Sequence, residues 1–150
     1  MFPVLEEIQQ FVQHTAEIIS SVLSLEIVIT NADSKVIAGT GNLEREIGFN
    51  YGENSLSGDL LRSKNKYHII RDTRKYPICK KCSRRKECQY LSVLVSSINL
   101  DDRTIGVLGI TATTLEQKTR LLNNINNLYD FTDKISVLLS SVIEEKKSKA

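Results

Sequence analysis

The sequence lacks several features that mark other classes of protein. Its longest apolar runs fall far short of the ~20 residues that a helix needs to cross a bilayer, so no membrane span is expected. The start of the chain, MFPVLEEIQQ, has neither the basic segment nor the continuous apolar segment of a secretory signal. We therefore expect a cytoplasmic protein in a reducing compartment, where disulfides are disfavoured.

Patterns typical of enzymes and nucleic-acid binders are also missing. The chain has only 2 histidines, its carboxylates are scattered and it shows no Ser/His/Asp or Cys/His arrangement. We therefore expect that the protein is not an enzyme. A net charge of +2 gives little overall attraction for nucleic acid, and we expect no direct nucleic-acid binding. The chain also contains no G-x-x-x-x-G-K-[ST] motif and no recognition helix.

What is present fits one α+β domain of 150 residues, which is long enough to fold without a metal or a disulfide. Apolar residues at intervals of four and three predict an amphipathic helix from Pro3 to Ser24. Short β-branched segments at 25–30, 35–38 and 67–70 predict three strands, and a helix is expected at 55–63. Segments 91–100 and 104–111 predict a long antiparallel hairpin.

From Thr114 onward the pattern predicts one long helix, with Thr114 as its N-cap. Its apolar positions also repeat at four and three, at Leu121, Ile125, Leu128, Thr132, Ile135, Leu139 and Val142. Two helices with this spacing predict a homodimer in which they pack together, although both stripes could instead cover the sheet. The element order predicts a five-stranded antiparallel sheet with long N- and C-terminal helices.

Three segments resemble a known family: residues 26–38, Glu46-Ile47-Gly48 and residues 104–110. They are similar to the PAS/GAF-like sensory domains at the amino terminus of bacterial sigma-54-dependent (enhancer-binding) transcriptional regulators, which are related to sugar-diacid recognition domains. The resemblance spans roughly residues 17–143. It implies a dimer or signal helix over 1–24, a PAS/GAF-like sensor core over 25–113, and a C-terminal signalling helix and linker over 114–150.

The resemblance also implies a function. The resemblance implies that such a domain senses a small molecule of the organic-acid or sugar-acid class. It would pass the signal through its terminal helix to ATPase and DNA-binding output domains. Because the concave face of such a sheet is the usual pocket, we expect ligand contacts from Arg71, Ser96 and Thr111. The alternative is a metal-stabilised interaction or dimerisation module without a small-molecule ligand.

All 3 cysteines lie in one basic loop, 76–90, with the spacing C-x2-C-x5-C. Cys79, Cys82 and Cys88 could supply three thiolate ligands to zinc or to an iron–sulfur cluster, with His68 as a fourth ligand. Redox sensing without a metal, or no role at all, remains open. Nearby cations are expected to lower the pKa of the thiols, namely Lys80, Lys81, Arg84 and Arg85.

Overall fold

The computed structural model describes residues 5–63, 65–82, 85–86 and 88–148. Its first half contains the 3-10 helix η1 (Leu5–Ile8), helix α1 (Gln9–Leu23), strands β1 (Glu26–Asn31) and β2 (Val36–Gly39), the 3-10 helix η2 (Gly41–Glu46) and helix α2 (Leu56–Arg62). Its second half contains β3 (Tyr67–Ile70), α3 (Pro77–Lys81), β4 (Ser92–Leu100), β5 (Arg103–Ala112), α4 (Leu115–Leu122) and α5 (Ile125–Ser148).

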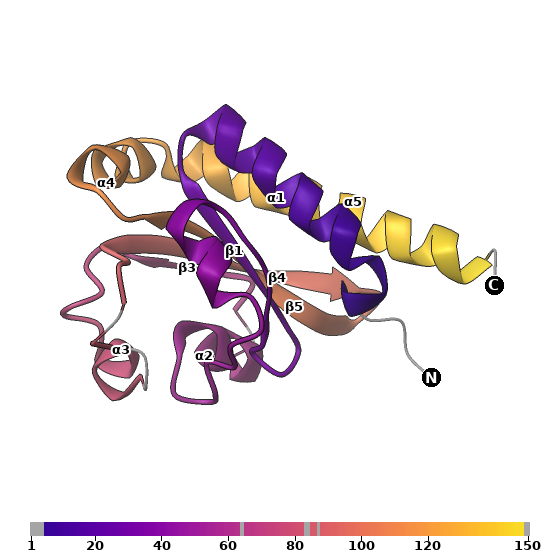
Figure 1. Ribbon diagram of the computed structural model, residues 1–150, viewed down its shortest axis with the longest axis horizontal. Coiled ribbons are helices and arrows are strands. Elements are labelled where there is room, and N and C mark those ends of the chain that lie inside the picture. Colours follow the sequence, from indigo (N-terminus) through magenta and orange to yellow (C-terminus); the bar gives the residue numbers. More distant parts are fainter. Residues whose placement is uncertain (1–4, 64, 83–84, 87, 149–150) are drawn as a thin grey trace.

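The five strands form one antiparallel sheet in the order β2-β1-β5-β4-β3, which confirms the predicted fold class. Figure 1 shows α1 and α5 above this sheet and α2 and α3 below it. Helix α1 packs on β1 and β2, and α5 packs on β4. Strand alternation therefore gives the sheet one face toward the long helices and one toward the short helices.

The larger hydrophobic core lies between the sheet and the long helices. It contains alternate residues of the central strands, such as Ile27, Ile29, Leu108 and Ile110, together with apolar residues of both helices. In α5, Leu128, Ile135 and Leu139 of the predicted stripe are buried in this core. Most of the apolar residues with heptad spacing thus pack on the sheet, whereas Ile18, Val22 and Leu138 are exposed. The homodimer stays a prediction.

The single C-terminal helix predicted from Thr114 is wrong in one respect, because the chain forms two helices, α4 and α5. Thr114 does cap α4, since its Oγ1 accepts a hydrogen bond from the Gln117 amide at 3.1 Å. Helix α4 ends before Asn123 and Asn124, and the Asn124 side chain donates to the Arg120 carbonyl at 2.7 Å. Short amide side chains compete in this way with the helical backbone bonds, which accounts for the break.

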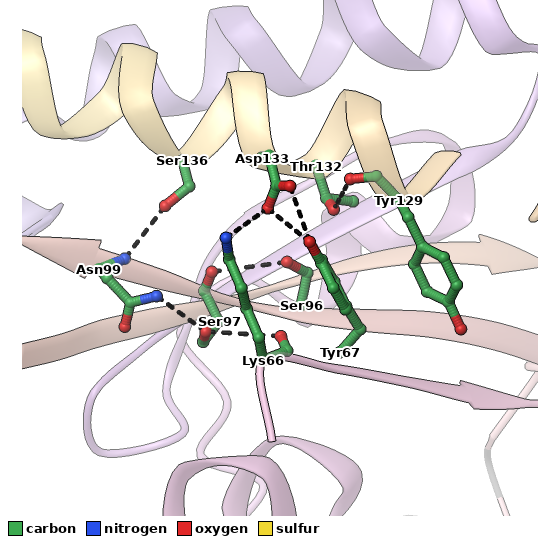
Figure 2. A network of polar contacts seen from close by, with 9 residues as sticks. All are labelled: Lys66, Tyr67, Ser96, Ser97, Asn99, Tyr129, Thr132, Asp133 and Ser136. Carbon is green, nitrogen blue, oxygen red and sulfur yellow. Dashed lines mark hydrogen bonds and ion pairs between the residues drawn. The ribbon is translucent and has the colours of Figure 1, made fainter. Parts of the chain in front are cut away.

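A polar network fixes α5 to the sheet (Figure 2). The Tyr67 hydroxyl donates its one hydrogen to the Asp133 carboxylate, whose two oxygens lie 2.7 and 2.8 Å from the hydroxyl oxygen. Lys66 Nζ forms an ion pair with the same carboxylate at 2.8 Å. Partial burial opposes ionisation of Asp133, but these bonds outweigh it and hold its pKa below the usual range. One turn further along α5, Ser136 Oγ accepts from the Asn99 amide at 3.1 Å. Helix α5 is thus anchored by polar bonds as well as by its apolar face.

Within the described part of the chain, no helix combines the length and apolarity needed to span a membrane.

Candidate functional site

A cavity of about 620 Å³ opens on the sheet face that carries the short helices. Its floor is apolar and comes from the residues of β1, β4 and β5 that alternate away from the long helices, namely Val28, Val93, Val95, Val107 and Gly109. Gly109 adds no side chain to this floor, and a Cβ at this position would lie too close to Val28, at 2.9 Å from its Cγ1. A pocket of this size, apolar with a few polar groups, is the usual form of a small-molecule site.

Polar side chains from the covering segments complete the lining. Thr30 and Ser57 share a hydrogen bond between their hydroxyl oxygens at 2.7 Å, which joins β1 to α2. The start of α2 is itself fixed by Ser55, whose Oγ accepts from the Gly58 amide at 3.0 Å. Two arginines, Arg74 and Arg85, also line the cavity. The lining therefore combines an apolar floor with hydroxyl groups and two cations.

Glu46, Tyr51 and Tyr90 form a connected part of this lining. The Tyr51 hydroxyl donates a short hydrogen bond to Glu46 Oε1, and its oxygen lies 2.9 Å from the Tyr90 hydroxyl oxygen. Burial is the main cause that raises the pKa of both phenols well above the usual range. Both tyrosines therefore keep their protons at neutral pH.

The cysteine loop forms one wall of the same cavity. Cys79, Cys82 and Cys88 all line it; the first two are half-buried thiols and Cys88 is exposed. Burial, followed by the neighbouring Cys88 and Cys82, raises the pKa of Cys79 to about 12, although Arg85 acts in the other direction. The expectation that nearby cations would lower the thiol pKa is therefore wrong for Cys79, because desolvation outweighs Arg85. Arg84 lies outside the described residues.

The predicted metal ligands are only partly brought together. The three cysteines share one wall, but among the described residues no three His, Cys, Asp or Glu side chains are arranged to hold a metal ion. His68 does not line the cavity; its Nε2 lies 2.9 Å from the Tyr76 hydroxyl oxygen, and the two rings meet edge to face. Tyr76 also donates to Asp59 of α2 at 3.3 Å. Within the described residues, His68 thus does not join the three cysteines in one ligand group.

The three predicted ligand contacts lie away from the cavity lining. Arg71 is exposed at the end of β3, and its carbonyl accepts from Ser92 Oγ at 2.6 Å. Ser96 is paired with Leu108 on the sheet face toward the long helices. Thr111 is on the cavity face but is fully buried and donates to the Glu26 carbonyl at 2.7 Å. The polar lining described above was not predicted; it comes mainly from loops, whose positions have no periodic signal.

The comparisons with known proteins agree with this fold. The chain is 30% identical over 145 residues to UacR of Escherichia coli K12, provisionally named a uric acid sigma-54-dependent transcriptional regulator. The match covers 95% of this chain but 24% of UacR, so the chain spans about a quarter of that relative. No family model matches the chain.

Solved structures with the same fold include two informative neighbours. The A. aeolicus nlh2 GAF domain in an inactive state has a TM-score of 0.65 and 13% identity, with 92% of this chain and 85% of that chain covered. A type II free methionine-R-sulfoxide reductase from Thermoplasma acidophilum has a TM-score of 0.62 and 16% identity, with 94% and 96% covered. The chain is therefore a GAF-fold domain related in sequence to a sigma-54-dependent transcriptional regulator, which confirms the resemblance described above.

Proposed function

We propose that this chain is the sensory domain of a sigma-54-dependent transcriptional regulator and that it binds a small anionic effector in the 620 Å³ cavity. The observation that carries the proposal is the lining itself, in which Arg74 and Arg85 stand beside an apolar floor. Guanidinium groups are the side chains best suited to hold a carboxylate or a similar oxyanion. The effect of binding would pass to ATPase and DNA-binding domains of the full-length protein.

The effector class is supported by the relative. UacR is named for uric acid, which is a weak acid with several oxygen atoms, and organic or sugar acids are the class expected from the sequence. We propose sensing and not catalysis. The reductase neighbour, at 16% identity, shares the fold alone. In addition, a thiol with a pKa of about 12 is almost fully protonated at neutral pH, so Cys79 is a poor nucleophile.

Thermal unfolding with a defined panel tests the proposal. The panel contains two pairs of acids: urate with 1,3,7-trimethylurate, and D-glucarate with adipate. A ligand at 100 times its Kd stabilises the native state by about 2.7 kcal/mol, which for a domain of this size raises Tm by roughly 5 °C or more. We expect such a rise for at least one acid. If neither this panel nor a wider set of anionic metabolites raises Tm, the interaction module without a ligand becomes the better interpretation.

A second candidate is a metal-stabilised form of the cysteine loop, with zinc or an iron–sulfur cluster. It is favoured by the common wall on which Cys79, Cys82 and Cys88 lie, and disfavoured by the absence, among the described residues, of a ready-made ligand group. Because metal ligands must be thiolates, binding at Cys79 has to displace a tightly held proton. The raised pKa therefore makes metal affinity strongly dependent on pH.

We expect zinc affinity to rise by about tenfold or more for each unit of pH between pH 6 and pH 8, since at least one proton is released per zinc bound. Competition with a chromogenic chelator, on protein purified without oxygen, measures this slope. The Cys82→Ser variant should bind at least about tenfold more weakly. If the purified protein contains neither zinc nor iron and a chelator leaves its Tm unchanged, the metal-binding candidate is wrong.

A further inference from the structure

One wall of the cavity belongs to the most basic part of the chain. Residues 71–88 contain 8 basic and 2 acidic residues, whereas the rest of the chain contains 12 basic and 16 acidic residues. The segment therefore has a formal charge of +6 and the rest of the chain −4, although the net charge is only +2. Because residues of this segment line the cavity, the positive charge of the protein is concentrated there.

Four lysines of this segment are exposed and lie just outside the cavity lining: Lys75, Lys80, Lys81 and Lys86. Each of them is next in sequence to a residue of the lining, namely Arg74, Cys79, Cys82 or Arg85. Consecutive Cα atoms are about 3.8 Å apart, so the lysine backbones lie at the edge of the cavity. We call these four residues the lysine rim.

Few carboxylates oppose the lysine rim. Within the described ranges, none of the four lysines forms an ion pair. Asp72 is half-buried and accepts a hydrogen bond from the Arg74 amide at 3.0 Å, and Asp59 has an ion-pair partner within α2. Glu46 is an acidic residue of the lining, and Glu87 lies outside the described residues. Positive charge is therefore in excess on this side of the cavity.

Such an arrangement acts on a charged ligand before any contact forms. A cleft surrounded by charge of one sign concentrates ions of the opposite sign and speeds their association by roughly 10- to 1,000-fold. Charges at the rim of a site act mainly on the association rate constant kon, whereas buried contacts act mainly on the dissociation rate constant koff. The lysine rim and the two arginines of the lining can therefore act on different steps of binding.

We propose that the lysine rim captures anionic effectors for the cavity, and that it favours acids with two negative charges over acids of the same size with one. The energy of an ion in a given potential is proportional to its charge, which accounts for the preference. The proposal rests on the function proposed above, since it concerns the ligand of the same cavity. It assigns a role to residues that do not line the cavity.

The double variant Lys80→Gln/Lys81→Gln tests the rim. Both residues are exposed at the end of α3, so the fold should tolerate the changes. The probe is D-glucarate, or urate if D-glucarate does not bind, and line-shape analysis of an NMR titration gives kon and koff. At about 0.02 M salt, where screening is weak, we expect kon to fall by about threefold or more and koff to change by less than about twofold.

The matched control is Lys134→Gln/Lys146→Gln. It removes two charges from exposed positions of α5, which Figure 1 shows on the other side of the sheet from α3. We expect kon to fall by less than about 1.5-fold, because these charges are more distant and better screened. Equal falls in the two double variants would assign the effect to net charge. A rise in koff without a fall in kon would show that the two rim lysines contact the bound acid. Either result would overturn the rim.

The unmodified protein gives an independent test of the charge preference. D-Gluconate has the six-carbon hydroxylated chain of D-glucarate but only one carboxylate. We expect kon for D-glucarate to exceed that for D-gluconate by about threefold or more at about 0.02 M salt, and the two to become nearly equal at about 1 M. If urate is the probe, its kon should fall by about threefold or more over the same range. Rate constants that do not depend on salt would contradict capture by the rim.

The outcomes also separate the two proposals. If an acid binds but its kon responds neither to salt nor to Lys80→Gln/Lys81→Gln, the rim is wrong while the sensory function stands. If no acid binds at all, the function proposed for the cavity fails, and the role of the lysine rim fails with it.

Discussion

Replacement of Leu139 by alanine is expected to lower the free energy of unfolding by about 2–5 kcal/mol, the usual cost of truncating a buried leucine. Leu139 is fully buried between α5 and the sheet, so the variant leaves a cavity in the main core. For a domain of this size the loss corresponds to a fall in Tm of at least about 5 °C. Urea denaturation followed by circular dichroism gives the free energy of unfolding, and a thermal melt gives Tm.

Leu138 is the matched control for this experiment. It is the preceding residue on the same helix, but 42% of its surface is exposed. Leu138→Ala should therefore change stability by less than about 0.5 kcal/mol in dilute solution. A larger loss that grows with protein concentration would place Leu138 in the predicted homodimer. Equal effects of the two substitutions at every concentration would contradict the packing of α5 on the sheet.

Arg85→Glu is expected to weaken binding of an anionic effector by about tenfold or more. Arg85 lines the cavity from the cysteine loop, and the variant replaces a charge-assisted donor with a like charge beside the ligand. The residue is exposed, so the fold should tolerate the change. Titration with the tightest-binding acid of the panel measures the loss.

Lys134→Glu separates this contact from the effect of net charge. The substitution makes the same change in charge at an exposed position of α5, on the other side of the sheet. It should lower affinity by less than about threefold at 0.15 M salt, where long-range interactions are largely screened. Equal losses in both variants would show that Arg85 acts through the general field of the protein, which would overturn its place in the site.

The sheet could be predicted closely because its strands have strong local signals. Strand β3 has the predicted bounds, and the hairpin of β4 and β5 differs from the prediction by one residue at each of three ends. The alternation of apolar residues also determined which face each strand residue would meet once the topology was known. The break between α4 and α5 was missed because the heptad pattern continues through Asn123 and Asn124, whereas the interruption depends on side-chain hydrogen bonds.

The site was harder to predict than the fold. Its floor follows from strand alternation. The sequence alone does not give the strand order, however, and Ser96, predicted as a ligand contact, lies on the opposite face of the sheet. Glu46 and Tyr90 are 44 positions apart and meet only because η2 and the cysteine loop cover the same cavity. The pKa of Cys79 depends on how deeply its sulfur is buried, which the neighbouring lysines and arginines in the sequence do not reveal.

Strand β3 is at the edge of the sheet, and both of its sides make side-chain bonds. Tyr67 is bonded to Asp133 of α5, while the next residue, His68, meets Tyr76 beside α3. A slip of one residue along β4 would exchange these two side chains between the faces and break both contacts. An edge strand of four residues would otherwise be free to change its pairing. The side chains of Tyr67 and His68 thus fix the register of this strand through contacts on opposite faces of the sheet.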